Sequence, residues 1–229
     1  MLKKLAVALC GLALSTGTFA GAITTYSNFG AWQGSVSGSV TLEDFTVSTH
    51  YPISSGILNS ATNEPSIGIT PGLIKPGVTY STPVGNSYFF NIDGLGGYTG
   101  GFLDGYYGGA PNRVLNIAFD SNASGFGFVT NSIMGTNFDI TINFSSGPAY
   151  TQNFAIVSGI SLDFFGFTST GADISSVVID GNGDSTFAFA LDDFRFTAGT
   201  TTPQLPEPGS LALMGLALAG LTTTRRKLR

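Results

Sequence analysis

Apolar and polar residues alternate along much of the middle of the chain, as they do in β-strands that bury one face. Strict alternation occurs in four segments, residues 39–47, 113–119, 137–144 and 173–180. Two further segments, residues 124–130 and 162–168, are rich in phenylalanine and glycine and also predict strands. No segment between the two ends of the chain has a convincing helical period. Many short strands joined by glycine- and asparagine-rich turns predict an all-β fold, a β-sandwich or jelly roll.

The last predicted strand, residues 185–196, contains an irregularity. Its large apolar residues occupy odd positions up to Leu191 and even positions from Phe194. This switch breaks the alternation and predicts a β-bulge near Asp192 and Asp193. Residues 55–86 depart from the pattern in another way, because they contain four prolines and predict a long loop or an insertion with weak strands.

The N-terminal segment has the pattern of a secretory signal peptide. Lys3 and Lys4 precede an apolar stretch, residues 5–14, and small residues follow it. Cleavage is expected after Ala20 or after Ala22, so residues 1–22 are assigned to a signal peptide that the Sec machinery exports. The single cysteine, Cys10, lies in the removed segment, and the mature chain therefore has no disulfide and no thiolate chemistry.

The C-terminal segment has three parts in a fixed order. A triplet of Pro206, Glu207 and Pro208 comes first, an uncharged run follows up to residue 224, and a basic end closes the chain with Arg225, Arg226 and Lys227. The prolines favour an extended peptide, and the uncharged run is at the short end of what crosses a bilayer as a helix. The basic end favours the cytoplasmic side. The pattern predicts a transmembrane helix beside an accessible peptide, with a plain membrane anchor as the alternative.

This tail resembles the PEP-CTERM sorting signal of Gram-negative bacteria, which also has the label "ice-binding protein C-terminal domain". The resemblance implies that exosortase, an integral-membrane cysteine transpeptidase, recognises residues 206–229 and that the protein reaches the cell surface or the extracellular space. It implies nothing about the domain before the tail, and no ice binding follows from the label. The sortase signal LPxTG of Gram-positive bacteria fits less well, because Pro208 stands where that signal has threonine.

Charge and composition limit what the exported part can bind. Between residues 23 and 205 there are three basic and 13 acidic side chains, a net charge of −10. Such a charge argues against nucleic acid and anionic lipid as partners. The chain contains 19 Phe and 8 Tyr, which is enough apolar surface to exclude disorder. We expect one domain at residues 23–199, followed by a linker at residues 200–205.

The sequence offers no catalytic constellation. His50 is the only histidine, it lies in a predicted loop, and no Gly-x-Ser-x-Gly motif is present to place a serine beside it. The sequence therefore predicts a protein that is not an enzyme. Carboxylates are abundant, and a glycosidase pair among them stays open as an alternative.

Calcium is the more plausible chemistry, because it takes six to eight oxygen ligands. Residues 41–45 and 190–194 form a matched pair of acidic segments, and they resemble segments of carbohydrate-binding jelly rolls in which a Glu near the first strand and an Asp on the last strand bind Ca²⁺. The resemblance implies a structural site at Glu43 with Asp193 or Asp192. Alternatively Glu43, Asp44 and Asp192 face solvent, or one of them pairs with Arg195. A weaker candidate is Asp180, Asn182 and Asp184, which also fit an ordinary hairpin turn.

Residues 94–109 are dominated by glycine and tyrosine. If exposed, the aromatic side chains of Tyr98, Phe102, Tyr106 and Tyr107 could stack on sugar rings, whereas the alternative is a surface loop whose aromatics cover the core. Taken together, the sequence predicts an exported surface or matrix protein with a structural or adhesive role in exopolysaccharide or biofilm, binding carbohydrate. The alternative is a secreted hydrolase that acts on polysaccharide.

Overall fold

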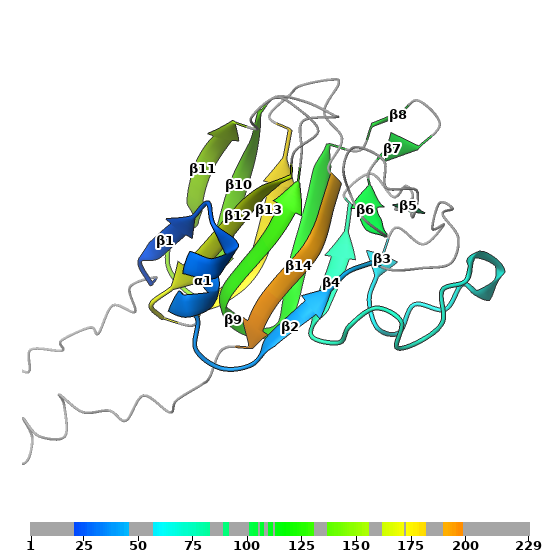
Figure 1. Ribbon diagram of the computed structural model, residues 1–229, viewed down its shortest axis with the longest axis horizontal. Helices are drawn as coiled ribbons and strands as arrows, with labels where there is room; N and C mark the ends of the chain where they lie inside the picture. The colour runs from blue at the N-terminus through cyan, green and yellow to red at the C-terminus, as the bar shows by residue number, and fades with distance from the viewer. Residues whose placement is uncertain are drawn as a thin grey trace, which may run out of the picture.

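The computed structural model describes residues 21–45, 57–82, 89–91, 101–104, 106–107, 110–111, 113–130, 137–155, 162–171, 173–181 and 190–198. Almost all of the described elements are strands, which confirms the all-β prediction (Figure 1). They are β1 (Ile23–Tyr26), α1 (Phe29–Ser35), β2 (Val40–Glu43), β3 (Ile57–Leu58), the 3₁₀ turn η1 (Pro65–Ile67), β4 (Val78–Ser81), β5 (Phe89–Asn91), β6 (Phe102–Asp104), β7 (Tyr106–Tyr107), β8 (Ala110–Pro111), β9 (Val114–Thr130), β10 (Asn137–Phe144), β11 (Tyr150–Ala155), β12 (Asp163–Ser169), β13 (Ile174–Asp180) and β14 (Ala190–Ala198).

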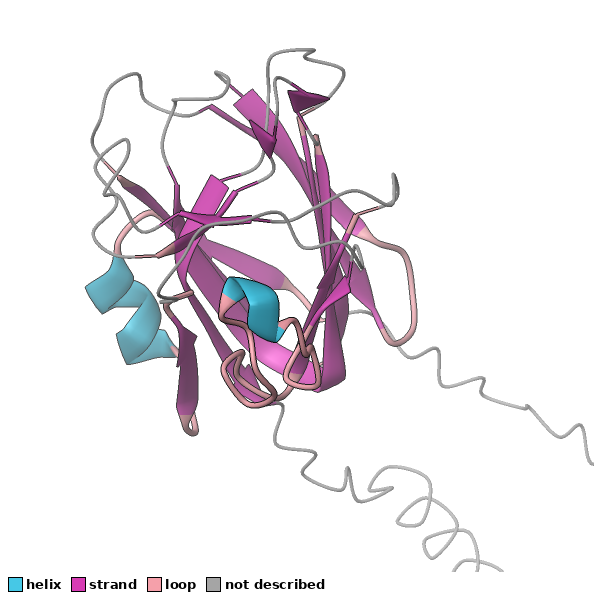
Figure 2. Ribbon diagram, turned by 90° about the vertical axis from the view of Figure 1, so that its right-hand side faces the viewer, coloured by secondary structure: helices cyan, strands magenta, loops and turns pink. Residues whose placement is uncertain are grey.

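The long strand β9 organises the sheet, because its two halves have different neighbours. The first half pairs with β13 and β4, and the second half pairs with β12 and β14. Every one of these pairings is antiparallel. The register with β13 shifts where β9 passes from one half to the other, and Asp120 and Ser121 are exposed there. One continuous 12-stranded sheet thus has two parts, which lie on two sides of the molecule in Figure 2.

Further strands extend each part of the sheet. The first part runs from β11 through β10, β13 and β9 to β4 and β3, and the second runs from β1 through β12 and β9 to β14. On the far side of β14, β2 pairs with its C-terminal end and β6 pairs with its N-terminal end. Strand β5 then pairs with β6, while β7 and β8 form a separate two-stranded ribbon.

The hydrophobic core lies on the inner faces of this sheet and is rich in phenylalanine. Phe126 of β9 stacks on Phe167 of β12 with ring centroids 4.8 Å apart. Phe194 of β14 stacks on Phe126 and on Phe119. Aliphatic side chains complete the core from the other part of the sheet, among them Ile117, Ile140, Ile142, Val177 and Ile179. The phenylalanine-rich segments predicted as strands therefore supply one wall of the core.

Helix α1 corrects the prediction that the domain has no helix. The side chain of Asn28 caps it by accepting a hydrogen bond from the amide of Ala31 at 3.1 Å. Trp32 is fully buried, and its indole Nε1 donates to the carbonyl of Phe167 at 3.1 Å. The helix has only seven residues, of which two are glycines. Because it makes less than two full turns, no helical period could develop in the sequence.

Glycines on the outer face of the sheet let α1 approach closely. Gly127 of β9 and Gly166 of β12 are paired across the two strands. A Cβ atom on either residue would lie 2.7 Å from the ring of Phe164, and one on Gly166 would also lie 2.8 Å from Cδ1 of Trp32. Only glycine therefore leaves room for these two aromatic rings.

Several strand predictions are confirmed and others need correction. The segment 137–144 is β10 with the predicted bounds. The segments 113–119 and 124–130, predicted as two strands, are the two halves of the single strand β9. The segment 55–86, predicted as a long loop or an insertion with weak strands, contains β3 and β4, and β4 is an interior strand paired with β3 on one side and β9 on the other. Strands β1 and β11 were not predicted at all.

Replacing Gly166 by alanine should destabilise the protein by roughly 1–3 kcal/mol, because the new methyl group has to displace two buried rings. Gly34→Ala in α1 is the matched control, since a Cβ atom there meets nothing within 4 Å. That change should be neutral or stabilise by up to about 1 kcal/mol through helix propensity. Urea unfolding of the two variants measures both effects, and equal stabilities would contradict the close packing of α1.

Candidate functional site

The two acidic segments singled out in the sequence lie side by side in the fold. Strand β2 pairs with β14 in antiparallel register, with Glu43 opposite Phe194 and Leu42 opposite Arg195. The predicted proximity of the segments is therefore confirmed. We call this region, formed by Glu43, Asp44, Asp192, Asp193 and Arg195, the acidic junction.

The predicted bulge in the last strand is also confirmed. The register between β14 and β9 shifts between Asp192 and Arg195, and Asp193 has a φ of 52°. Positive φ values are uncommon for residues other than glycine, although aspartate tolerates them better than most. The bulge lets Leu191 and Phe194 both enter the core although they are three positions apart.

The buried side chain of Glu43 connects β2 to the loop before β4 through hydrogen bonds. Its side chain is 1% exposed, and each carboxylate oxygen accepts a backbone hydrogen bond. Oε1 accepts from the amide of Phe45 at 3.0 Å, and Oε2 accepts from the amide of Lys75 at 2.6 Å. Burial raises the pKa of Glu43, and the two amide donors offset only part of that rise.

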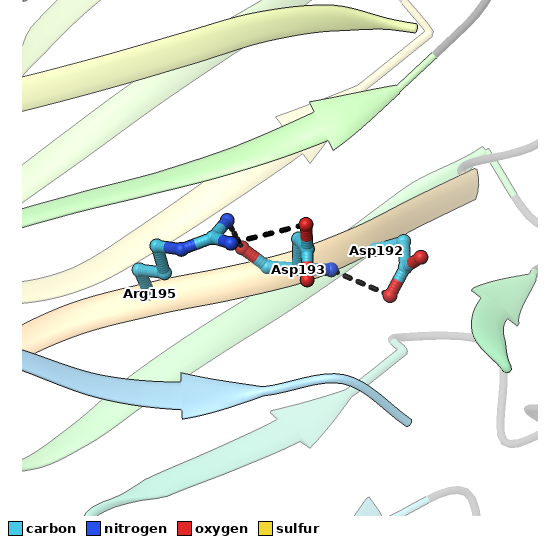
Figure 3. Close-up of polar contacts among 3 residues, drawn as sticks. All are labelled: Asp192, Asp193 and Arg195. Carbon is cyan, nitrogen blue, oxygen red and sulfur yellow. Dashed lines mark hydrogen bonds and ion pairs between the residues drawn. The ribbon is translucent and has the colours of Figure 1, made fainter. Parts of the chain in front are cut away.

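Asp192 is the most strongly perturbed carboxylate of the junction. Its side chain is 6% exposed, and Oδ1 accepts a hydrogen bond from the amide of Asp193 at 2.6 Å (Figure 3). Its pKa is raised to about 7, mainly by burial and in part by the charges of Asp193 and Asp44, while the hydrogen bond from the Asp193 amide and the charge of Arg195 lower it. Asp44 also raises the pKa of Glu43, so the two buried carboxylates share one negative environment.

Asp193 is directed away from Asp192 and pairs with Arg195. The guanidinium Nη2 lies 3.0 Å from Oδ2 of Asp193, and Nη1 donates to the carbonyl of the same residue at 2.8 Å (Figure 3). The guanidinium carbon of Arg195 also lies 4.4 Å from the ring centre of Phe29 in α1. The sequence left open a pair of Arg195 with Glu43, Asp44 or Asp192, and the structure shows the pair with Asp193 instead. The side chain of Arg195 thus connects the bulge to α1. The ion pair itself contributes little to the stability of the fold, because Asp193 is partly exposed.

Calcium binding at the junction stays a prediction. Within the described ranges no three His, Cys, Asp or Glu side chains come together in a group that could hold a metal ion. Glu43 and Asp192 would supply only part of the six to eight oxygens that calcium needs.

The other sequence candidates fall in different places. Asp180 ends β13, opposite Asp139 of β10 and Val114 of β9. Phe102 is 1% exposed, which excludes it as a sugar contact and fits the alternative that aromatic residues of this segment cover the core. Tyr106 and Tyr107 form β7, which pairs with β8. The remaining candidates lie outside the described residues; they are His50, Tyr98, Asn182, Asp184, Pro206, Glu207, Pro208, Arg225, Arg226 and Lys227.

One buried residue beside the acidic junction carries no signal in the sequence. Tyr80 of β4 is fully buried, and its hydroxyl has no hydrogen-bond partner in the described part of the chain. Its ring packs edge-on against Phe45 and Phe194, with centroids 5.3 and 5.7 Å away. Burial, and then the charge of Glu43, raise the pKa of Tyr80. It lies in the segment predicted as a long loop or an insertion with weak strands, where no pattern marks it as a core position.

Comparison with known proteins gives one match, in the C-terminal tail. The family model described as the PEP-CTERM protein-sorting motif matches residues 204–227. The chain thus carries the sorting motif that the sequence predicted, and the motif indicates an exported protein that is held in the membrane before exosortase processes it. No curated protein matches the chain significantly. Among the residues that the structure describes, no helix is long and apolar enough to span a membrane; the predicted transmembrane helix lies beyond them.

The raised pKa of Asp192 predicts a specific dependence of stability on pH. Because its pKa in the folded protein, about 7, lies above the ordinary value of 3.8, the contribution of Asp192 to stability is greatest below about pH 4 and is lost as the pH rises through 7. Asp192→Asn keeps the oxygen that accepts the Asp193 amide but cannot ionise. We expect its melting temperature to exceed that of the wild type by several degrees at pH 8, and the two to converge near pH 4.

Asp193→Asn is the matched control, because that carboxylate is partly exposed and paired with Arg195. Because the Asp193 charge is only one of the causes that raise the pKa of Asp192, this variant should gain much less at pH 8, and a gain equal to that of Asp192→Asn would contradict the assignment. Calcium is tested in the same assay, since a bound cation would stabilise ionised Asp192. Free calcium at about 100 times its Kd would add roughly 2.7 kcal/mol to the unfolding free energy of the wild type. It would add nothing to that of a Glu43→Gln, Asp192→Asn double variant. Identical melting of the wild type in calcium and in chelator contradicts the calcium prediction.

Proposed function

We propose that this chain is a surface or extracellular-matrix protein of a Gram-negative bacterium, with a structural or adhesive role in exopolysaccharide or biofilm. The observation that carries the proposal is the sorting motif at residues 204–227. Export and sorting by exosortase follow from that motif. Its order of extended triplet, uncharged run and basic end fits an enzyme that works on a peptide at the membrane surface.

The charge of the exported domain supports a role outside the cell. A net charge of −10 between residues 23 and 205 keeps the domain soluble and away from anionic surfaces. We propose that the two parts of the sheet form a β-sandwich, because the halves of β9 pair with different strands and enclose one core. Sandwiches commonly present ligand sites on their loops or faces. Tyr98, Tyr106 and Tyr107 are the candidate sugar contacts in this proposal, without the buried Phe102.

A secreted hydrolase of polysaccharide is the second candidate, and one observation favours it. Asp192 is a carboxyl group with a pKa of about 7, and it lies in the same acidic environment as Glu43. A glycosidase needs one carboxyl that stays protonated near neutral pH beside a second carboxylate. In the adhesive proposal the same perturbation is only a result of burial.

Replacing Pro206, Glu207 and Pro208 by three alanines should stop maturation, because the extended recognition peptide is lost while the uncharged run remains. The precursor should then stay in the membrane fraction at full length on an immunoblot. A matched control replaces Thr200, Thr201 and Thr202 in the predicted linker by alanine and should mature normally. If the triplet variant matures and leaves the membrane like the wild type, the tail is an anchor only.

Screening the exported protein against bacterial exopolysaccharides separates the two candidate roles. We expect binding without turnover, and weaker binding after Tyr106→Ala and Tyr107→Ala. Release of reducing sugar ends that is abolished by Asp192→Asn would instead establish the hydrolase. Neither binding nor turnover with any polysaccharide would contradict both.

A further inference from the structure

The backbone nitrogen of Gly21 is held by a carboxylate far away in the sequence. It donates to Oδ2 of Asp173 at 3.0 Å, although the two residues are 152 positions apart. The next residue is also fixed, because the amide of Ala22 donates to Oγ1 of Thr170 at 3.1 Å and its carbonyl accepts from the amide of Thr170. Strand β1 then pairs with β12 from Ile23 onward. The chain is thus tied to the fold from the residue that directly follows Ala20, one of the two predicted cleavage positions.

Asp173 is oriented so that one oxygen is available to Gly21. Its Oδ1 accepts a hydrogen bond from Oγ of Ser169 at 2.6 Å, and that hydroxyl in turn accepts from the amide of Gly171 at 3.2 Å. Both donors to the carboxylate are neutral groups in the uncleaved chain. In the described part of the chain, the ion pair between Arg195 and Asp193 is the one salt bridge, and Asp173 has no cationic partner there.

The space around Gly21 admits no side chain. A Cβ atom at this position would overlap Oγ of Ser169 and would lie 2.6 Å from the backbone nitrogen of Gly171. Glycine is therefore required for this close approach, independently of the hydrogen bond to Asp173. Its bare backbone nitrogen reaches a carboxylate that any larger residue would hold at a distance.

We propose that the signal peptide is cleaved between Ala20 and Gly21, and that the ammonium group created at Gly21 forms an ion pair with Asp173 that locks β1 onto β12. Water adds across the peptide bond: the carboxylate leaves with Ala20 on the leader, and the nitrogen of Gly21 gains protons to become an ammonium at neutral pH. The inference rests on the proposed export, because this charge exists only after the leader is removed.

The chemistry of the contact favours this position over cleavage after Ala22. An ammonium–carboxylate hydrogen bond is roughly twice as strong as one between neutral groups, so cleavage after Ala20 strengthens a bond that is already in place. Cleavage after Ala22 would instead remove both residues and every contact they make with Asp173 and Thr170. A terminal strand is poorly ordered unless it is tied down, and β1 pairs with β12 alone among the described strands.

The first test is mass spectrometry of the N-terminal peptide of the exported protein. We expect the mature chain to begin at Gly21. A mature chain that begins at Ile23, or at any other residue, overturns the inference but leaves export intact. Absence of any processed protein outside the cell overturns the proposed export and the ion pair together.

The second test is a double-mutant cycle on the exported protein. One form begins at Gly21, and a matched form uses a leader whose cleavage leaves two extra alanines, which moves the ammonium roughly 7 Å away along an extended chain. Asp173→Asn is introduced into both, because it keeps an acceptor oxygen but removes the charge. The substitution should lower the melting temperature by about 2–4 °C more in the form that begins at Gly21.

Equal losses in the two forms overturn the ion pair, even if the mature chain begins at Gly21. Ser169→Ala keeps the test decisive if Asp173→Asn does not fold. It removes the hydroxyl that orients Asp173. It also removes the acceptor of the Gly171 amide, but that loss is the same in both forms and cancels in the comparison. A larger loss in the form that begins at Gly21 supports the ion pair, and an equal loss again overturns it.

Discussion

The backbone hydrogen bonds of β9 connect parts of the sheet that would otherwise be separate. Among the described strands, four groups meet only through it: β11, β10 and β13; β12 and β1; β4 and β3; and β14 with β2, β6 and β5. Each group must bury an apolar face, and none has a second sheet of its own to pack against. The first half of β9 pairs with two of these groups and its second half pairs with the other two. The inner faces of all four groups therefore surround one core.

The two faces of this sheet impose opposite demands on the sequence. The inner face is filled by large rings such as those of Phe126 and Phe167, whereas the outer face has the paired glycines Gly127 and Gly166. That glycine surface receives Trp32 and Phe164, and the guanidinium of Arg195 packs over Phe29 of the same helix. The bulge at Asp193 therefore has consequences on both sides, because it keeps Phe194 in the core and directs the ion pair toward α1.

The features that were predictable from the sequence are those encoded by alternation within one strand. Strand β10 was predicted with its bounds, and the bulge followed from the change of parity after Leu191. Features that depend on distant partners were not predictable. The polar residues around Asp120 suggested a break between two strands, yet pairing continues on both sides of them. Prolines near β4 suggested a loop, although none lies within the strand itself. Phe102 belongs to a glycine-rich segment and is buried because β6 pairs with β14.

For the acidic junction, the sequence predicts which strands meet but not the contacts or the ionisation of its side chains. The likeness of two short acidic segments was enough to place β2 beside β14, with Glu43 opposite Phe194. It could not reveal that the Glu43 carboxylate accepts a hydrogen bond from the amide of Lys75, nor that its charge acts on Tyr80. Both residues come from the segment predicted as a long loop or an insertion with weak strands. The state of ionisation of these groups is set by burial, which is a property of the whole sheet. A sorting signal differs in this respect, since a processing enzyme recognises it as an extended peptide. Its information lies in the order of residues alone, and so the function of residues 204–227 could be inferred without the fold, while that of the junction depends on it.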